Sequence, residues 1–302
     1  MKLLKILSLL GFSLIVNNSV SNFVELAVIP CAGLGTRLLP LSKAVPKELV
    51  PILDKPAIEY VVQEAINSNL KKFCIVTNPD KVAIEKYFSH NYKLERELKN
   101  KGKLHLLANL NQIIDKAKFV YPNQLEPLGL GHAVLMAKKY VKTDFFAVLL
   151  PDDIYNPDHK VIGTLLKKAQ EENTSIIAVQ EVPQNKVSSY GIISYKNKLG
   201  DNLFEISNVV EKPSIDKAPT NLAIVGRYIL HKDIFSSIEK IAKATQEGEI
   251  QLTDAIADMI ANGHKVLALK INETRHDVGN LEGLIKANFD VGTTSSYSHL
   301  LK

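Results

Sequence analysis

The residues between Pro30 and Pro51 are of types that bind phosphate groups. Gly33 and Gly35 follow directly on an apolar run, and a segment with one arginine and two lysines comes next. Glycine lets backbone N–H groups approach a ligand closely, while arginine and lysine neutralise phosphate oxygens. This order indicates a loop that wraps a nucleotide triphosphate, although a Gly-x-Gly pair alone occurs in many unrelated loops.

The same loop does not fit a dinucleotide-binding fingerprint. The third glycine is missing, Arg37 stands where such a loop continues towards its helix, and Pro40 and Pro46 prevent a long helix. A dinucleotide site also needs a ribose-binding acid at the end of a second strand, but Pro79 and Asp80 follow the second apolar run. The sequence therefore argues against a dinucleotide-dependent oxidoreductase.

The chain as a whole has the composition of an ordinary globular protein. Of its 302 residues, 46% are hydrophobic and 23% are charged, and this length allows one large α/β domain or two small ones. The net charge of +5 suits polyanionic small molecules as well as RNA. Cys31 and Cys74 have no metal-binding spacing and lie in or beside apolar runs, so we expect buried thiols in a reducing compartment.

Alternating strands and helices are expected to position the glycine loop. This alternation predicts a Rossmann-like, doubly wound parallel sheet that helices cover on both faces. The expected strands are 26–31, 73–78, 117–123 and 145–153, and the expected helices are 57–69, a charged region at 81–101 and one after Gly131.

After Asp153 the spacing of the strands shortens, which predicts a mixed sheet that extends the first and carries the pocket of a second substrate. The expected strands are 174–182, 190–196, 204–213, 222–230 and 265–271, and the expected helices are 248–263 and 280–292. No repeat or low-complexity linker interrupts this order. We therefore expect one continuous α/β domain at 23–292, followed by a C-terminal tail at 293–302.

Eight motifs in a fixed order give this sequence a resemblance to a known family. They are AGLGTRLLPLSKAVPKELVPILDKP (32–56), GLGHAV (129–134), LLPDDI (149–154), YGI (190–192), VVEKP (209–213), NLAIVGRYIL (221–230), GEIQLTDAI (248–256) and HDVGN (276–280). This set resembles the bacterial UTP–glucose-1-phosphate uridylyltransferases, or UDP-glucose pyrophosphorylases, over roughly residues 24 to 292. The resemblance implies a fold of the nucleotide-diphospho-sugar transferase type. It also implies Mg²⁺-dependent transfer of a uridylyl group from UTP to glucose 1-phosphate, with release of pyrophosphate.

The resemblance implies roles for individual residues at the nucleotide. Arg37 and Lys47 are expected on the phosphates and, with Lys212, as the catalytic cations. Gln124 and Gly129 are expected to read the uracil edge, where hydrogen bonds can discriminate between bases. The complete expected nucleotide-binding set is Ala32, Gly33, Gly35, Thr36, Gln124 and Gly129.

It further implies a sugar-phosphate site and a metal site. Gly191, Glu211 and Lys212 are expected to hold the sugar phosphate, with Glu211 on the glucose hydroxyls and Lys212 on the phosphate. Asp152 and Asp277 are expected to bind Mg²⁺, which favours a few carboxylates with water and phosphate oxygens. Without the resemblance, such residues more often belong to a turn, a helix cap or a surface ion pair.

Four positions depart from the family pattern, and at one of them Cys31 stands where a small apolar residue is usual. Ser42 stands where threonine is common and keeps the hydroxyl group. Asn123 and Leu128 stand where arginine and lysine are common. Two positive charges beside the expected nucleotide are thus absent. This difference bears on the affinity for the nucleotide but not on the class of reaction.

Two alternatives stand beside this interpretation. A related sugar-1-phosphate nucleotidyltransferase, such as a thymidylyltransferase, shares the glycine loop but not, as a rule, the combination of GLGHAV, EKP and HDVGN. A catalytically silent sensor of sugar nucleotides is expected to have lost at least one charged residue of the site. All five of these residues are present, namely Arg37, Lys47, Asp152, Lys212 and Asp277.

Residues 1–22 conflict with the rest of the sequence. Lys2 and Lys5 precede a short apolar run that has the form of a signal peptide. The resemblance instead implies a cytoplasmic homo-oligomeric enzyme, because UTP and glucose 1-phosphate are made and used in the cytoplasm, and it implies no nucleic-acid or membrane partner. We therefore expect residues 1–22 to be a signal-like or spurious extension, so that a chain beginning near Asn22 folds and stays active.

Overall fold

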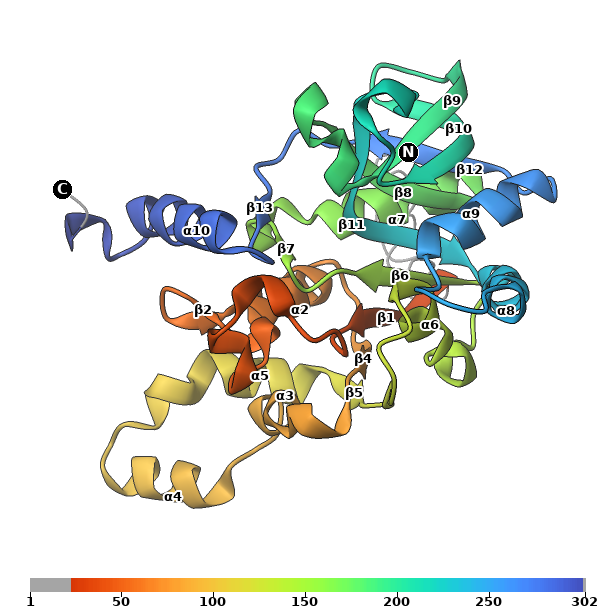
Figure 1. Cartoon of the computed structure of the whole chain (residues 1–302). Helices are drawn as coiled ribbons and strands as arrows, with labels where there is room; N and C mark the ends of the chain where they lie inside the picture. Colours follow the sequence, from red (N-terminus) through yellow and green to blue (C-terminus); the bar gives the residue numbers. More distant parts are fainter. Residues whose placement is uncertain (1–22, 301–302) are drawn as a thin grey trace, which may run out of the picture.

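A nine-stranded mixed sheet forms the centre of the computed structural model, which describes residues 23–300 (Figure 1). The strand order is β5-β4-β1-β6-β11-β8-β12-β10-β9. These strands are β1 (Val24–Pro30), β4 (Lys72–Val76), β5 (Lys118–Val120), β6 (Phe145–Leu149), β8 (Ser175–Glu181), β9 (Gly191–Lys198), β10 (Leu203–Glu211), β11 (Leu222–His231) and β12 (Val266–Lys270). The expectation about residues 1–22 lies outside the described residues.

The predicted division of the sheet is confirmed. Strands β5, β4, β1 and β6 pair in parallel, as in a doubly wound sheet. Strand β11 then runs antiparallel to both β6 and β8, and β9 and β10 form an antiparallel pair at the far edge. The two parts are continuous because β11 joins them.

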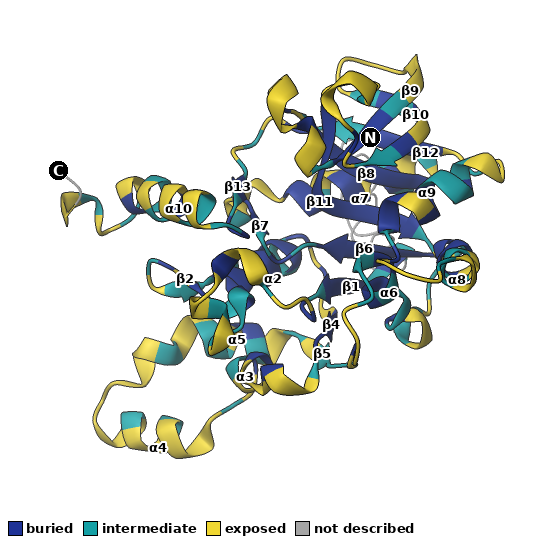
Figure 2. Cartoon of the chain, viewed as in Figure 1, coloured by how far each residue is buried: buried dark blue, intermediate teal, exposed yellow. Residues whose placement is uncertain are grey.

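Helices cover both faces of this sheet, as expected. Successive strand residues point to opposite faces, so Ala27 and Ile29 belong to one buried cluster and Leu26 and Val28 to the other. Helices α2, α3, α5 and α7 contribute to the first cluster, and α6, α8 and α9 contribute to the second. Both strand faces are therefore buried (Figure 2).

The α-helices in residues 23–300 are α2 (Ala57–Asn67), α3 (Val82–Tyr87), α4 (Tyr92–Asn100), α5 (Ala108–Lys116), α6 (Leu130–Leu135), α7 (Val161–Glu172), α8 (Ile234–Ala244), α9 (Leu252–Ala261) and α10 (Leu281–Thr294). Short 3₁₀ helices are η1 (Thr36–Leu38), η2 (Leu41–Lys43), η3 (Lys47–Leu49), η4 (Pro79–Lys81), η5 (Leu104–Leu107), η6 (Lys138–Tyr140), η7 (Pro157–His159), η8 (Gln184–Ser189), η9 (Ile215–Lys217) and η10 (Ser298–Leu300). Over this part of the chain, none of the helices combines the length and the apolar character that crossing a bilayer requires.

Three expectations about secondary structure need correction. The charged region 81–101 is not one helix but η4, α3 and α4, because the side chain of Asn91 accepts a hydrogen bond from Leu94 N and starts a new helix there. The helix expected at 248–263 begins only at Leu252, because the backbone of Ile250 pairs with Leu128 and Gly131. The strand expected at 145–153 ends at Leu149 and turns.

After the turn, the chain forms a strand that the sequence analysis did not separate from β6. Strand β7 (Asp153–Ile154) pairs antiparallel with β13 (His276–Asp277), and Asp277 lies opposite Asp153. A second small sheet joins β2 (Pro51–Ile52) and β3 (Lys55–Pro56). Helix α10 follows β13 and extends away from the sheet (Figure 1).

A fully buried ion pair holds the turn between β6 and β7. Arg227 and Glu64 are both 0% exposed, and Arg227 Nη2 lies 2.8 Å from Glu64 Oε2. The guanidinium also donates to the carbonyl oxygens of Leu150 at 3.2 Å and Asp153 at 2.8 Å. Burial works against the charge of Arg227, but attraction to Glu64 outweighs it and raises the pKa of the guanidinium. The pair therefore ties α2 to both sides of Asp152.

We expect replacement of Arg227 by methionine to destabilise the protein strongly, because Glu64 is then left buried without its partner. The expected loss in the free energy of unfolding is about 3–5 kcal/mol. Urea unfolding followed by circular dichroism measures it. The matched control is Lys72→Met, which breaks an exposed ion pair with Glu25 and is expected to cost less than about 1 kcal/mol. Equal effects of the two substitutions would contradict the importance of the buried pair.

Candidate active site

The glycine loop after β1 is held in place through its carbonyl oxygens. Lys81 Nζ donates to the carbonyl oxygens of Cys31 at 2.6 Å and Gly33 at 2.7 Å, and the side chain of Asn78 donates to that of Ala32 at 2.9 Å. Lys81 is itself fixed by both oxygens of buried Glu48, each 3.0 Å away. The loop is thus anchored to the start of α3 by a buried cation.

This anchoring leaves backbone donors free on the loop. The N–H groups of Gly33, Leu34 and Gly35 donate to no group in residues 23–300. Gly35 has φ 69°, the left-handed conformation that favours glycine, and Ser42 Oγ donates to its carbonyl oxygen at 2.8 Å. Three unpaired N–H groups on one turn form a site that attracts anions.

A cavity of about 400 Å³ lies beside this loop. The residues expected at the nucleotide that line it are Ala32, Gly33, Gly35, Thr36, Lys47, Gln124 and Gly129. Gly129 has φ 96°, and a side chain there would approach Ile250 O to 2.8 Å, so only glycine fits this wall. The structure therefore brings the expected nucleotide residues around one hollow.

Gln124 is buried and held in a defined orientation at this cavity. Its Nε2 donates to Gly129 O at 3.1 Å and lies 2.9 Å from His132 Nδ1. Burial lowers the pKa of the His132 imidazole, which suits a neutral ring that accepts at Nδ1. The amide nitrogen of Gln124 is thus occupied, and its oxygen is the atom that can accept a hydrogen bond from a ligand.

Asp152 follows the end of β6 and lies among cations. Lys47 Nζ is 2.5 Å from Asp152 Oδ2, and Arg37 Nη2 is 3.8 Å from the same atom. Burial alone would raise the pKa of Asp152, but Lys47 and Arg37 outweigh it and hold that pKa below its ordinary value. Burial likewise opposes the charge on Lys47, whereas Asp152 and Glu48 raise the pKa of its ammonium. Both groups are therefore charged near neutral pH.

Asp277 faces the same point as Asp152, from a different part of the chain. Val278 N donates to Asp152 O at 2.8 Å, and Gly279 N donates to Asp277 Oδ1 at 3.1 Å. A side-chain carbon built on Gly279 would meet Asp152 Oδ2 at 2.9 Å and Asp277 Oδ1 at 3.2 Å. Two carboxylate oxygens thus converge over a glycine, and such hard oxygen donors fit a magnesium ion.

A larger cavity, of about 620 Å³, adjoins the first and contains the residues expected at the sugar phosphate. Thr253 Oγ1 donates to Glu211 Oε2 at 3.0 Å, and Lys212 Nζ lies 3.3 Å from Glu211 Oε1. Lys212 has φ 43°, which a residue with a side chain rarely adopts, and its N–H donates to Tyr190 O at 3.0 Å. Gly191 also lines this cavity.

The two cavities meet at Asp152. Asp152, Thr36 and Glu249 line both of them, whereas Arg37 and Asp277 line the larger one. An anion in the first cavity and an anion in the second would therefore approach each other beside one carboxylate and the cations around it. This is the geometry that joining two phosphate compounds requires.

Several supporting residues were not anticipated from the sequence. Arg275 Nη1 lies 2.7 Å from Asp153 Oδ1, and Arg275 Nη2 donates to the Tyr190 hydroxyl at 3.0 Å. Burial raises the pKa of Asp153 to about 6, although Arg275 acts in the opposite direction. The role of Lys81 could not be predicted, because this residue begins a charged segment that is typical of a solvent-exposed helix. Arg275 had a usable signal, since it directly precedes the HDVGN motif.

Known proteins resemble this chain in sequence and in fold. Residues 26–294 match the nucleotidyl transferase family. A UTP–glucose-1-phosphate uridylyltransferase of Bacillus subtilis is 42% identical over 269 residues, which cover 89% of this chain and 90% of that protein. A solved structure of a UTP-bound UDP-glucose pyrophosphorylase from Acinetobacter baumannii is 37% identical, with a TM-score of 0.82, and covers 92% of this chain and 98% of its own. Another, complexed with UDP-glucose, is 35% identical, with a TM-score of 0.79, and covers 90% and 100%.

These similarities extend over nearly the whole described sheet and both cavities. The resemblance carried by the eight motifs is confirmed, as is the predicted fold class. A likeness that spans about nine tenths of each partner is not confined to the glycine loop that related nucleotidyltransferases share. The chain belongs to the UTP–glucose-1-phosphate uridylyltransferase family of nucleotidyl transferases.

Proposed function

We propose that the protein transfers a uridylyl group from UTP to glucose 1-phosphate, which yields UDP-glucose and pyrophosphate. The observation that carries this proposal is the meeting of two anion-adapted cavities at Asp152. The first takes UTP and the second takes the sugar phosphate. A silent sensor is disfavoured because Lys47 lines the first cavity and Arg37 and Lys212 line the second.

The reaction needs alignment and charge neutralisation rather than a general base. A phosphate oxygen of glucose 1-phosphate is already an anion near neutral pH and attacks the α-phosphorus of UTP, and the pyrophosphate leaves in line. Lys47 and Arg37 neutralise the nucleotide phosphates, while Lys212 holds the phosphate of the sugar. Glu211 is positioned by Thr253 to accept hydrogen bonds from glucose hydroxyls. The residues therefore bring together two compounds that would otherwise repel each other.

The carboxylates of Asp152 and Asp277 would hold a Mg²⁺ ion. When bound, this ion supplies positive charge to the phosphate oxygens. The support lies in the convergence of the two carboxylates over Gly279 and in their hard oxygen donors. Lys47 Nζ is paired with Asp152 Oδ2, so the same carboxylate would hold both the lysine and the ion.

Preference for uracil is assigned to Gln124. Its amide nitrogen is engaged by Gly129 and His132, so its oxygen is left to accept a hydrogen bond from the N3–H group of the base. Cytosine lacks a hydrogen on N3 and cannot make this bond. Thymine has it, so discrimination against TTP has to come from its methyl group or from the ribose 2′-hydroxyl group that TTP lacks.

The direct test combines purified protein with Mg²⁺, a panel of nucleoside triphosphates and several sugar 1-phosphates. We expect pyrophosphate release to be fastest with UTP and glucose 1-phosphate, because only UTP satisfies both Gln124 and the cavity walls. Excess chelator is expected to abolish turnover, and added Mg²⁺ to restore it. Equal rates with UTP and TTP would contradict the base assignment, and full turnover in chelator would contradict the metal assignment.

Lys212→Met and Arg37→Met are expected to change the kinetics towards different substrates. Loss of Lys212 removes a charge-assisted contact to the sugar phosphate, so kcat/KM for glucose 1-phosphate should fall by roughly 10²–10³, or about 2–4 kcal/mol. Loss of Arg37 should raise the KM for UTP and slow the chemical step. Steady-state kinetics with each substrate varied separately distinguishes the two.

The matched control for Lys212 is Lys217→Met, which removes an exposed lysine five positions further along the chain and outside both cavities. It is expected to keep the kinetics of the unaltered protein. Unchanged kinetics for glucose 1-phosphate in Lys212→Met would show that the sugar-phosphate site lies elsewhere.

A cytoplasmic location and assembly from identical copies complete the proposal. The location follows from the substrates, which are cytoplasmic metabolites. The assembly is supported by α10, where Leu281, Ile285 and Phe289 are 62%, 61% and 56% exposed. These residues are four positions apart and share one helix face, while Leu284 and Val291 on another face pack against the body. The free face suits the same face of a second copy, because homo-oligomers commonly pair identical patches.

We expect the protein to sediment as a dimer or larger homo-oligomer, and Phe289→Lys to shift it towards the monomer because the charge would be buried between copies. Analytical ultracentrifugation at several concentrations measures the mass. Leu106→Lys, at an exposed apolar residue of η5, is the control and should leave the mass unchanged. A monomer at all concentrations would refute assembly through α10.

A further inference from the structure

A cavity of about 370 Å³ lies at the opposite end of the central strands from the active site. His231 ends β11 and pairs with Phe145, the first residue of β6, whereas Asp152 follows the end of β6. The lining of this cavity also includes His264, from the turn between α9 and β12. None of its residues lines either of the two catalytic cavities.

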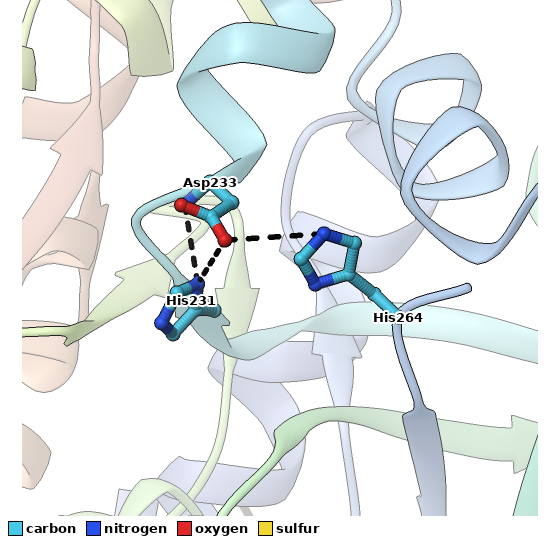
Figure 3. A group of neighbouring side chains, drawn as sticks. All are labelled: His231, Asp233 and His264. Atoms are coloured by element: carbon cyan, nitrogen blue, oxygen red, sulfur yellow. Dashed lines mark hydrogen bonds and ion pairs between the residues drawn. The ribbon is translucent and has the colours of Figure 1, made fainter. Parts of the chain in front are cut away.

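Three potential ligands for a metal ion, namely His231, Asp233 and His264, converge beside this cavity, and the two histidines line it (Figure 3). His231 Nδ1 lies 3.1 Å from Asp233 Oδ2, and His264 Nε2 lies 3.9 Å from the same oxygen. All three ligand atoms lie within 4.8 Å of one another. In residues 23–300 no other group of three such side chains meets this criterion.

These separations match those expected around one ion. Nitrogen and oxygen ligands lie about 2.0–2.2 Å from zinc, so two ligands of one ion are at most about 4 Å apart. Both separations from Asp233 Oδ2 fall within that span. A shift of less than about 1 Å in the half-exposed His264 ring brings all three atoms into range.

The backbone around the ligands is already fixed. His231 N donates to Ser175 Oγ at 2.9 Å, and the His231 ring packs edge-on against Phe145 with centroids 5.0 Å apart. Asp233 immediately precedes α8, and His264 N donates to Met259 O at 3.1 Å at the end of α9. Two turns therefore present the ligands. Asp233 N donates to His231 Nδ1 at 3.3 Å, and an ion bound at that nitrogen would replace this hydrogen bond.

The charges nearby do not oppose a cation. Lys232 lies between two of the ligands in sequence, but its Nζ is paired with Asp144 Oδ1 at 2.7 Å. Lys265, next to His264, is paired with Glu172 at 3.3 Å. Asp144, which lines the cavity, thus balances the positive charge of Lys232.

We propose that His231, Asp233 and His264 form a binding site for a divalent transition-metal ion of the zinc class. Two imidazole nitrogens and one carboxylate suit zinc and its neighbours, whereas magnesium favours oxygen ligands alone. Water completes the coordination. The ion links the turn between β11 and α8 to the turn between α9 and β12, and thereby stabilises the folded state. This proposal is independent of the reaction at Asp152.

The test is calorimetric titration of Zn²⁺ into the metal-stripped full chain, in excess Mg²⁺ so that the catalytic carboxylates are occupied. We expect one Zn²⁺ per chain, and Co²⁺ in its place should give the visible absorption of a nitrogen-ligated ion. His231→Asn and His264→Asn should each weaken Zn²⁺ binding at least about tenfold, because each removes one of three ligands. His105→Asn, at an exposed histidine elsewhere, is the matched control and should bind normally.

Thermal unfolding supplies a second measurement. Saturating Zn²⁺ should raise the melting temperature of the unaltered chain and of His105→Asn by about 5 °C, but not that of His264→Asn. Circular dichroism without metal shows whether each variant is folded, and Asp233→Asn replaces any variant that is not. Absence of Zn²⁺ binding in the unaltered chain would overturn the proposal. Equal Zn²⁺ binding by the histidine variants and the control would also overturn it.

Discussion

The structure depends on the buried ion pair between Arg227 and Glu64. The candidate active site has the Asp152 carboxylate just after β6, a strand that is buried on both faces, and the ion pair holds the backbone of the turn that carries Asp152. The guanidinium binds the carbonyl oxygens on either side of Asp152, and Glu64 accepts a further hydrogen bond from Ile162 N at 2.8 Å. Helices α2 and α7 and the strands β6 and β11 thus meet at a single pair. A charge buried in this way is costly unless it is fully hydrogen-bonded, and here it is.

The cations of the candidate site are each paired with a carboxylate. Lys47 is paired with Asp152, Lys212 with Glu211, and Arg275 with Asp153. Each pairing holds a flexible side chain in the place where a phosphate or a hydroxyl group is expected. The cost of ordering these chains is therefore met during folding rather than on binding of substrate, which is the advantage of a preorganised electrostatic site.

Much of this could be predicted from the sequence, and the remainder could not for physical reasons. The strands, the proline-rich glycine loop and the residues that face the cavities follow from local patterns and from motif order. The supports of the loop do not, because Lys81 and Asn78 act on backbone carbonyls nearly fifty positions away, and no local pattern records such a contact. The delayed start of α9 has a similar cause, since the backbone of Ile250 is taken by pairing with Leu128. The side chains of His231, Asp233 and His264 also come together only through the fold.

The pairing of β7 with β13 connects the candidate active site to helix α10, which extends away from the sheet. Asp277 belongs to β13, and α10 begins at Leu281, directly after the turn whose Asn280 side chain caps the helix through Gly283 N. The turn also touches Asp152 through Val278 N. Three residues therefore separate Asp277 from the start of α10, and one of them is hydrogen-bonded to Asp152. A rotation of α10 would therefore change the distance between the carboxylates of Asp152 and Asp277.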